Sequence, residues 1–218
     1  PMTSPPLKAL RSVGVFGLLL AALCLAAPQS AQGQLWLQTS RVLTPVENGP
    51  TRAFLDTLIN VMEQKDVRVK RSPEQNGKMN VSALRNQLIS ENGIGLGSAN
   101  HAFIDYRFSI DNGSRFRQSI TTIHFVFRPG PNQNDISIMH IDAQQPWVER
   151  VIHQKGTSLR TNEAALIPFH RHLSFANIAR QTKTQVVEIG GRTVREKFDE
   201  RKAALIRKVE RLTYESFV

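Results

Sequence analysis

The sequence has almost no cysteine, and this absence excludes several classes of protein. Cys24 is the only cysteine among the 218 residues. It lies in an N-terminal segment that we expect to be removed, so the remaining chain has no disulfide, no zinc–thiolate site and no cysteine nucleophile. An exported domain held together by packing alone is more typical of a bacterial periplasm than of an animal extracellular space, where small domains depend on disulfides.

The short motifs of common catalytic and nucleotide-binding sites are absent as well. The sequence contains no Gly-x-Ser-x-Gly, no His-Glu-x-x-His and no Gly-Lys-Ser/Thr phosphate loop. Gly93, Gly95 and Gly97 have a spacing like that of a dinucleotide-binding loop, but that loop follows a strand and opens a helix. Here a helix is predicted before the glycines and a strand after them, so we interpret this segment as a connector. No zinc-finger, RRM or basic-zipper pattern occurs, which argues against nucleic acid as a partner.

One apolar run is present, and it is short for a membrane span. It covers residues 13–27, follows Lys8 and Arg11, and is followed by small residues at Gly33 and two positions before it. This order is typical of a signal peptide. We predict that 1–33 is a signal peptide cleaved after Gly33 and that the mature protein is periplasmic or secreted. The alternatives are an uncleaved membrane anchor and a lipoprotein.

The net charge of the chain is strongly positive, at +10. Loss of the predicted signal peptide removes only two of these basic residues, Lys8 and Arg11. In an exported protein such a charge favours contact with anionic lipid headgroups, lipopolysaccharide phosphates or acidic proteins, and it allows peripheral contact with a membrane. The alternative interpretation is that the charge only solvates long helices.

Hydrophobic periodicity predicts an α+β fold with a mainly antiparallel sheet. The start of the mature chain has the pattern of a strand–helix–strand unit, with Thr51 as the N-cap of its helix and a parallel pair of strands possible. A second helix is predicted at 81–90. The middle of the chain has the pattern of an antiparallel meander, with a bulge early in its second strand. Its four strands are expected at 102–110, 115–127, 135–142 and 147–153.

The last third of the chain has one ambiguous segment and two clear ones. Residues 162–181 follow no clean period, whereas 184–195 predicts a tight hairpin around Gly190 and Gly191. A long amphipathic helix is predicted at the C-terminus, where acidic residues near its start and basic residues near its end complement the helix dipole. Its apolar stripe consists of Phe198, Leu205, Ile206, Val209 and Leu212. Because no linker is evident, we expect 34–218 to form a single domain.

Histidines offer one candidate site. If strands 115–127 and 135–142 pair so that their apolar residues share one face, His124 lies opposite His140 on the other face, with Asp142 two residues further along. Two imidazoles and a carboxylate can bind zinc or copper or carry out acid–base chemistry. The alternative is that these are ordinary strand histidines, facing solvent or packed under a helix.

A further pair, His170 and His172, has the spacing of two metal ligands on one side of a strand. Together with His124, His140 and Asp142, these residues define the alternative function that we consider, a metal-dependent periplasmic enzyme using zinc or copper. Apart from this alternative, the sequence predicts no cofactor.

Arginines of the predicted meander offer a second candidate site, for anions. They are flanked by aromatic residues, and a guanidinium group can grip a phosphate or carboxylate through its planar fork. The alternative is that they discourage edge-to-edge pairing of strands. These residues are Arg107, Arg115, Arg117 and Arg128. We therefore predict a non-enzymatic envelope protein that binds a partner protein or an anionic envelope component.

Overall fold

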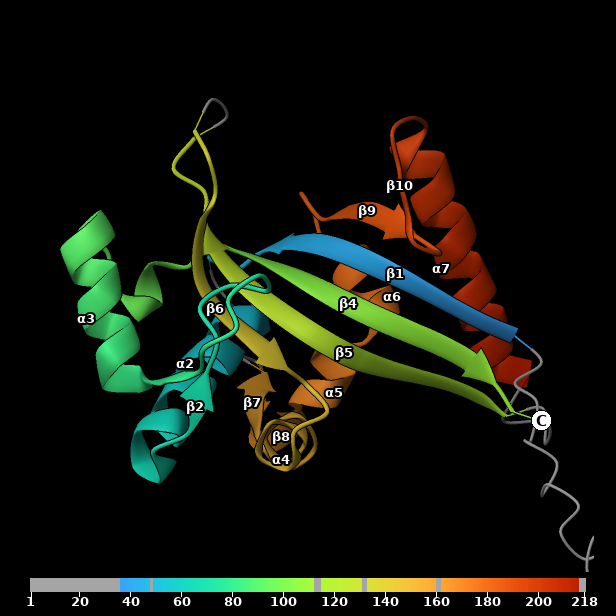
Figure 1. The fold of residues 1–218 in the computed structure, drawn as a ribbon. Helices are drawn as coiled ribbons and strands as arrows, with labels where there is room; N and C mark the ends of the chain where they lie inside the picture. Colours follow the sequence, from blue (N-terminus) through green and yellow to red (C-terminus); the bar gives the residue numbers. More distant parts are fainter. Residues whose placement is uncertain (1–35, 48, 112–114, 131–132, 160–161, 216–218) are drawn as a thin grey trace, which may run out of the picture. The chain divides into compact units, whose positions relative to one another are not determined.

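A six-stranded antiparallel sheet forms the centre of the described structure, and helices cover one of its faces (Figure 1). All of the described residues belong to the compact unit that spans residues 35–218. The predicted signal peptide, 1–33, lies outside the described residues. The computed structural model describes residues 36–47, 49–111, 115–130, 133–159 and 162–215.

The sheet joins strands from the start, middle and end of the chain, and all neighbouring strands are antiparallel. The predicted α+β class is confirmed, as are the first three strands of the predicted meander. Their order, β4-β5-β6, continues through β1 on the other side of β4. In sheet order the strands are β10 (Arg192–Thr193), β9 (Gln185–Ile189), β1 (Trp36–Pro45), β4 (His101–Ile110), β5 (Phe116–Phe127) and β6 (Ile136–Asp142).

Alternation of side chains gives this sheet two different faces. In β4 the residues Ala102, Ile104, Tyr106 and Phe108 are buried, because they point towards the helices that lie behind the sheet in Figure 1. We call this the core face. The opposite face, which we call the outer face, carries the polar residues of the same strand, such as Arg107.

A bulge interrupts β5 where the sequence predicted one. Asp105 pairs with Thr122, but its neighbour Tyr106 pairs with Ile120, so Thr121 is an extra residue in β5. The bulge changes which residues of β5 face the core. The core-facing residues are Phe116, Gln118 and Ile120 before the bulge, and Ile123 and Phe125 after it.

The predicted fourth strand of the meander, 147–153, is wrong. The segment forms helix α4 (Pro146–Gln154), which buries Val148, Val151 and Ile152. These three positions have the i, i+3, i+4 spacing of one helix face, and proline is well suited to the first position of a helix. The segment therefore has helical spacing and does not continue the meander.

The predicted N-terminal order of strand, helix and strand is confirmed, but the parallel pairing is wrong. Helix α2 (Pro50–Lys65) is followed by β2 (Arg68–Val69), which pairs antiparallel with β3 (Met79–Asn80) in a separate small sheet. The predicted cap is also wrong, because Gly49 occupies the N-cap position. Thr51 is the second residue of the helix, and it is buried.

The second predicted helix, α3 (Val81–Asn92), is confirmed. The side chain of Asn80 caps it by accepting a hydrogen bond from the backbone N–H of Ala83 at 2.9 Å. Gly93 ends it in the left-handed conformation. A short 3₁₀ helix, η1 (Leu96–Ser98), then leads into β4. The glycines therefore follow a helix and precede a strand, as predicted for a connector.

The ambiguous segment contains a second small sheet and two short helices. Strands β7 (Gly156–Leu159) and β8 (Asn162–Pro168) pair antiparallel, and they are followed by α5 (Phe169–His172) and α6 (Phe175–Ala179). The mixture of strand and short helix explains why the sequence showed no single period. The predicted hairpin is confirmed as β9 and β10, joined by two glycines with positive φ.

Helix α7 (Phe198–Glu215) confirms the predicted C-terminal helix. Leu205 and Val209 are buried beneath it, whereas Phe198 is exposed at its start. On the core face, the ring of Phe175 in α6 packs edge-on against Tyr106 and Phe108 of β4. No helix in the described part of the chain is long and apolar enough to cross a membrane.

Candidate functional site

The predicted pairing of His124 with His140 is present in the structure. The two residues are direct cross-strand partners in β5 and β6, with ring centres 5.8 Å apart and rings edge to face. Both lie on the outer face, because their apolar neighbours occupy the core face. Those neighbours are Ile123, Phe125, Met139 and Ile141, all buried.

A segment between β2 and β3 lies next to this histidine pair. The backbone N–H of His140 donates to the carbonyl oxygen of Lys70 at 2.8 Å, so Lys70 forms a bridge with the free side of β6. Beyond Lys70, the chain borders a cavity of about 320 Å³. The cavity is lined by Arg41, Pro73, Glu74, Phe103, Asp105, Thr122, His124 and His140.

Burial favours the neutral form of both imidazoles. Burial, with a smaller contribution from the adjacent His140, lowers the pKa of His124 to about 4. Burial also lowers the pKa of His140, helped by the positive charge of Lys70. The exposed carboxylate of Glu74 has a lowered pKa, mainly because of a backbone hydrogen bond and secondarily because of a hydrogen bond with the side chain of Ser72.

Of the two carboxylates that line this cavity, that of Asp105 is already engaged. Arg41 donates to both oxygens of Asp105, from Nε at 2.6 Å and from Nη2 at 3.0 Å, and Thr122 Oγ1 donates to Oδ2 at 2.6 Å. His124 Nε2 lies 3.0 Å from the hydroxyl of Ser137. His140 Nδ1 is buried and has no hydrogen-bond partner among the described residues. Asp105 and His124 therefore belong to a hydrogen-bonded polar network and are not free acid–base groups.

The other predicted metal ligands do not join this pair. Asp142 lies on the same face, opposite Thr122, and its Oδ1 caps the following turn by accepting from Gln144 N at 2.9 Å. His170 and His172 lie on the short helix α5 rather than on a strand, so their side chains project in different directions. Within the described ranges no three His, Cys, Asp or Glu residues come together as a metal site.

Three of the four predicted arginines gather at one end of the sheet. Arg117 pairs with Ser109, two residues from Arg107, so the two arginines are diagonal neighbours on the outer face. Arg115 lies next to the start of β5. Arg128 lies beyond the opposite end of this strand, where its Nε is 2.8 Å from Asp135.

The positive charge at this end of the sheet is only partly neutralised. Arg117 is exposed and forms an ion pair with Asp111 at 3.2 Å. Arg107 and Arg115 are also exposed, and neither has an ion-pair partner in the described part of the chain. We use the name arginine cluster for Arg107, Arg115 and Arg117.

A groove lies on the core face of the same end of β5, and the sequence did not predict it. Its volume is about 960 Å³, and it runs between β5, the α5–α6 segment and the second half of α7. Phe116, Val209 and Tyr214 provide apolar surface, while Arg171 contributes a positive charge. We call it the β5–α7 groove. Because its walls come from widely separated parts of the chain, no local pattern could have revealed it.

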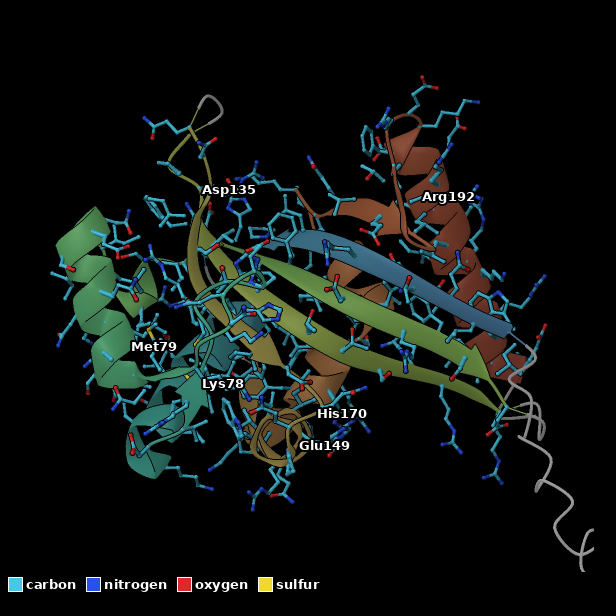
Figure 2. The ribbon with its side chains drawn as sticks, viewed as in Figure 1. Lys78, Met79, Asp135, Glu149, His170 and Arg192 are labelled. Atoms are coloured by element: carbon cyan, nitrogen blue, oxygen red, sulfur yellow. The ribbon has the colours of Figure 1, made fainter. Side chains whose placement is uncertain are left out.

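The groove continues into a smaller cavity of about 370 Å³ beside α4. His153, His170 and Gln118 line both spaces. The rings of His153 and His170 stack with centres 5.1 Å apart. Burial lowers the pKa of His170, and His153 and Arg171 lower it further. Figure 2 shows His170 close to Glu149, which lines the smaller cavity.

Comparison with models of protein families, with curated proteins and with solved structures finds no match to this chain.

Proposed function

We propose that this chain is an exported, non-enzymatic envelope protein that binds an acidic segment of a partner protein in the β5–α7 groove. The observation that carries the proposal is the groove itself, a largely apolar space of about 960 Å³ whose wall includes the positive charge of Arg171. Such a groove is large enough for several side chains of a bound peptide.

The charges around the groove favour an acidic ligand. Arg171 has no ion-pair partner among the described residues, and the arginine cluster lies at the same end of the sheet as the groove. The acidic residue in the groove wall, Glu210, is neutralised by an ion pair with Arg180. Complementary charge of this kind steers a partner to its site and selects against basic ligands.

The polar pocket around His124 and His140 supports an enzyme less well. Asp105 is held by Arg41 and Thr122, and it is therefore not free to act as a base. The histidine pair has no third metal ligand within the described ranges. Export rests on the predicted signal peptide and on a mature chain without cysteine, as expected for a periplasmic protein.

Binding can be tested with a fluorescein-labelled peptide of about ten residues in which valine and aspartate alternate. A matched peptide with lysine in place of aspartate is the control. We expect saturable binding of the acidic peptide alone, measured by fluorescence anisotropy. Arg171→Glu should weaken it about tenfold, whereas Arg192→Glu, on the distant strand β10, makes the same change of charge and should not.

Two outcomes would contradict the proposal. One is equal binding of the acidic and basic peptides, or binding of neither. The other is failure of the acidic peptide together with co-sedimentation of the protein with phosphatidylglycerol vesicles but not with phosphatidylcholine vesicles. That second result would assign the positive surface to an anionic envelope component instead of a partner protein.

A further inference from the structure

One half of β5 has a free edge. Strand β6 pairs only with residues 122–127 of β5. The last contact at its C-terminal end is the hydrogen bond from Ala143 N to Thr121 O at 2.9 Å, after which the chain leaves this edge. Along residues 116–119, β4 lies on one side, and no other strand among the described residues lies on the other (Figure 1). A free edge of this kind is a template for another strand.

The backbone groups that face this free edge can be identified from the ladder. Asp111 N donates to Arg115 O at 3.3 Å across the end of the β4–β5 pair, so the backbone N–H and C=O groups of Arg115 face β4. Because backbone groups alternate in direction along an antiparallel strand, those of Arg117 and Ser119 also face β4. The N–H and C=O groups of Phe116 and Gln118 therefore face outwards, towards the free edge.

Different side chains lie on the two sides of this edge. The side chains of Phe116 and Gln118 line the β5–α7 groove on the core face. Arg117 lies on the outer face, with Arg107 diagonally behind it on β4. A strand added to the edge would alternate between these two environments, because its successive side chains point to opposite faces.

We infer that the acidic partner segment binds as an added β-strand along residues 116–119 of β5. Its apolar side chains enter the β5–α7 groove, and its acidic side chains face the arginine cluster. This inference rests on the proposed function and adds the binding mode and the sequence pattern of the ligand. Charge complementarity argues for an acidic partner over a second copy of this basic chain, since two such surfaces would repel each other.

Peptide backbone methylation tests the inference directly. The alternating valine–aspartate peptide is made in two further forms, N-methylated at every second residue, either at the valines or at the aspartates. An added strand uses the N–H groups of only one of these sets to pair with β5. We expect one form to lose at least about tenfold in affinity and the other to bind like the parent peptide.

The outcomes separate this inference from the proposed function. If the parent peptide fails to bind, the proposed function fails. If the parent binds and both methylated forms bind equally well, or both lose affinity equally, strand addition is wrong while the groove remains the binding site.

A variant of the protein gives an independent readout. Gln118→Pro removes an N–H that faces the free edge, where proline is tolerated, so the fold should be retained. We expect it to abolish peptide binding, whereas Gln118→Ala, which keeps the N–H and loses only the side chain that lines the groove, should weaken binding much less. Hydrogen exchange measured by NMR should show new protection of the Phe116 and Gln118 amides on binding to the unaltered protein. Equal binding by the two variants, or unchanged exchange at these amides in the peptide complex, would overturn the inference.

Discussion

The ammonium group of Lys208 lies 4.2 Å from the centre of the indole ring of Trp36. This contact connects the half-buried Lys208 of α7 to the first residue of β1, at the end of the sheet that carries the β5–α7 groove. The ring of Trp36 in turn stacks on Phe108, and Phe108 on Phe116 in the groove wall. The position of α7 is therefore linked to the groove by a continuous row of aromatic rings across three strands.

The packing of α7 leads to a graded prediction for stability. Leu205 is buried, and Leu205→Ala should lower the free energy of unfolding by about 2–5 kcal/mol. Lys208→Ala removes only the contact with Trp36 and should lower it by about 0.5–1 kcal/mol. Arg207→Ala, at an exposed position of the same helix, serves as the control and should be nearly neutral. Urea titration distinguishes the three, and equal small effects would mean that α7 is detached from the sheet.

The histidine pair predicts a loss of stability in mild acid. The pKa of His124 is about 4 in the folded protein and near 6.5 in the unfolded chain, so only the unfolded chain binds a proton between these values. Stability is therefore full above pH 6.5 and falls as the pH drops towards 4. The loss from this residue is of the order of 2–3 kcal/mol.

Urea titrations at pH 7.5 and pH 4.5 measure this loss. The difference between the two should shrink in His124→Gln, since glutamine does not titrate. Arg207→Ala, at an exposed position of α7 away from the histidine pair, is the control and should keep the full difference. An identical pH dependence in the unaltered protein and His124→Gln would show that His124 is not buried as neutral imidazole.

Zinc is expected to leave the protein unchanged. A ligand that binds only the folded state at about 100 times its Kd adds about 2.7 kcal/mol of stability. With only His124 and His140 facing each other, we expect no rise in Tm when zinc is added at low micromolar concentration. A rise that disappears in both His124→Ala and His140→Ala would contradict this expectation and make the metal-dependent enzyme the leading function.

The predicted export has a simple test outside the described residues. N-terminal sequencing of protein from the periplasmic fraction should begin at Gln34, because cleavage is predicted after Gly33. A full-length product in the cytoplasm would remove the basis for an envelope protein. Material retained in the membrane with residues 1–33 attached would favour the uncleaved anchor.

Much of the sheet could be predicted because its strands alternate clearly. The requirement that Ile123 and Phe125 share a buried face with Ile141 and Met139 fixes the pairing of β5 with β6, including the position of His124 opposite its partner. The C-terminal helix was equally clear, since Leu205 and Val209 are four residues apart and both are buried.

The errors occurred where a local pattern was compatible with two structures. Residues 147–153 were expected to complete the meander as a strand, but Pro146 and the spacing of Val148, Val151 and Ile152 favour a helix. The groove could not be predicted at all. Phe116 and Val209 become neighbours in its wall only through the packing of α7 against the sheet, which no periodicity records.

The bulge at Thr121 puts the two halves of β5 in opposite phase. Before it, even-numbered residues face the core and odd-numbered residues face outwards; after it, the assignment is reversed. Deleting this one residue would move every side chain in one half of β5 to the opposite face of the sheet. If the half that pairs with β6 kept its place, Arg117 would enter the apolar groove and Phe116 would point to solvent. The number of residues between the two ends of β5 therefore determines which side chains line the groove, just as the identity of those side chains does.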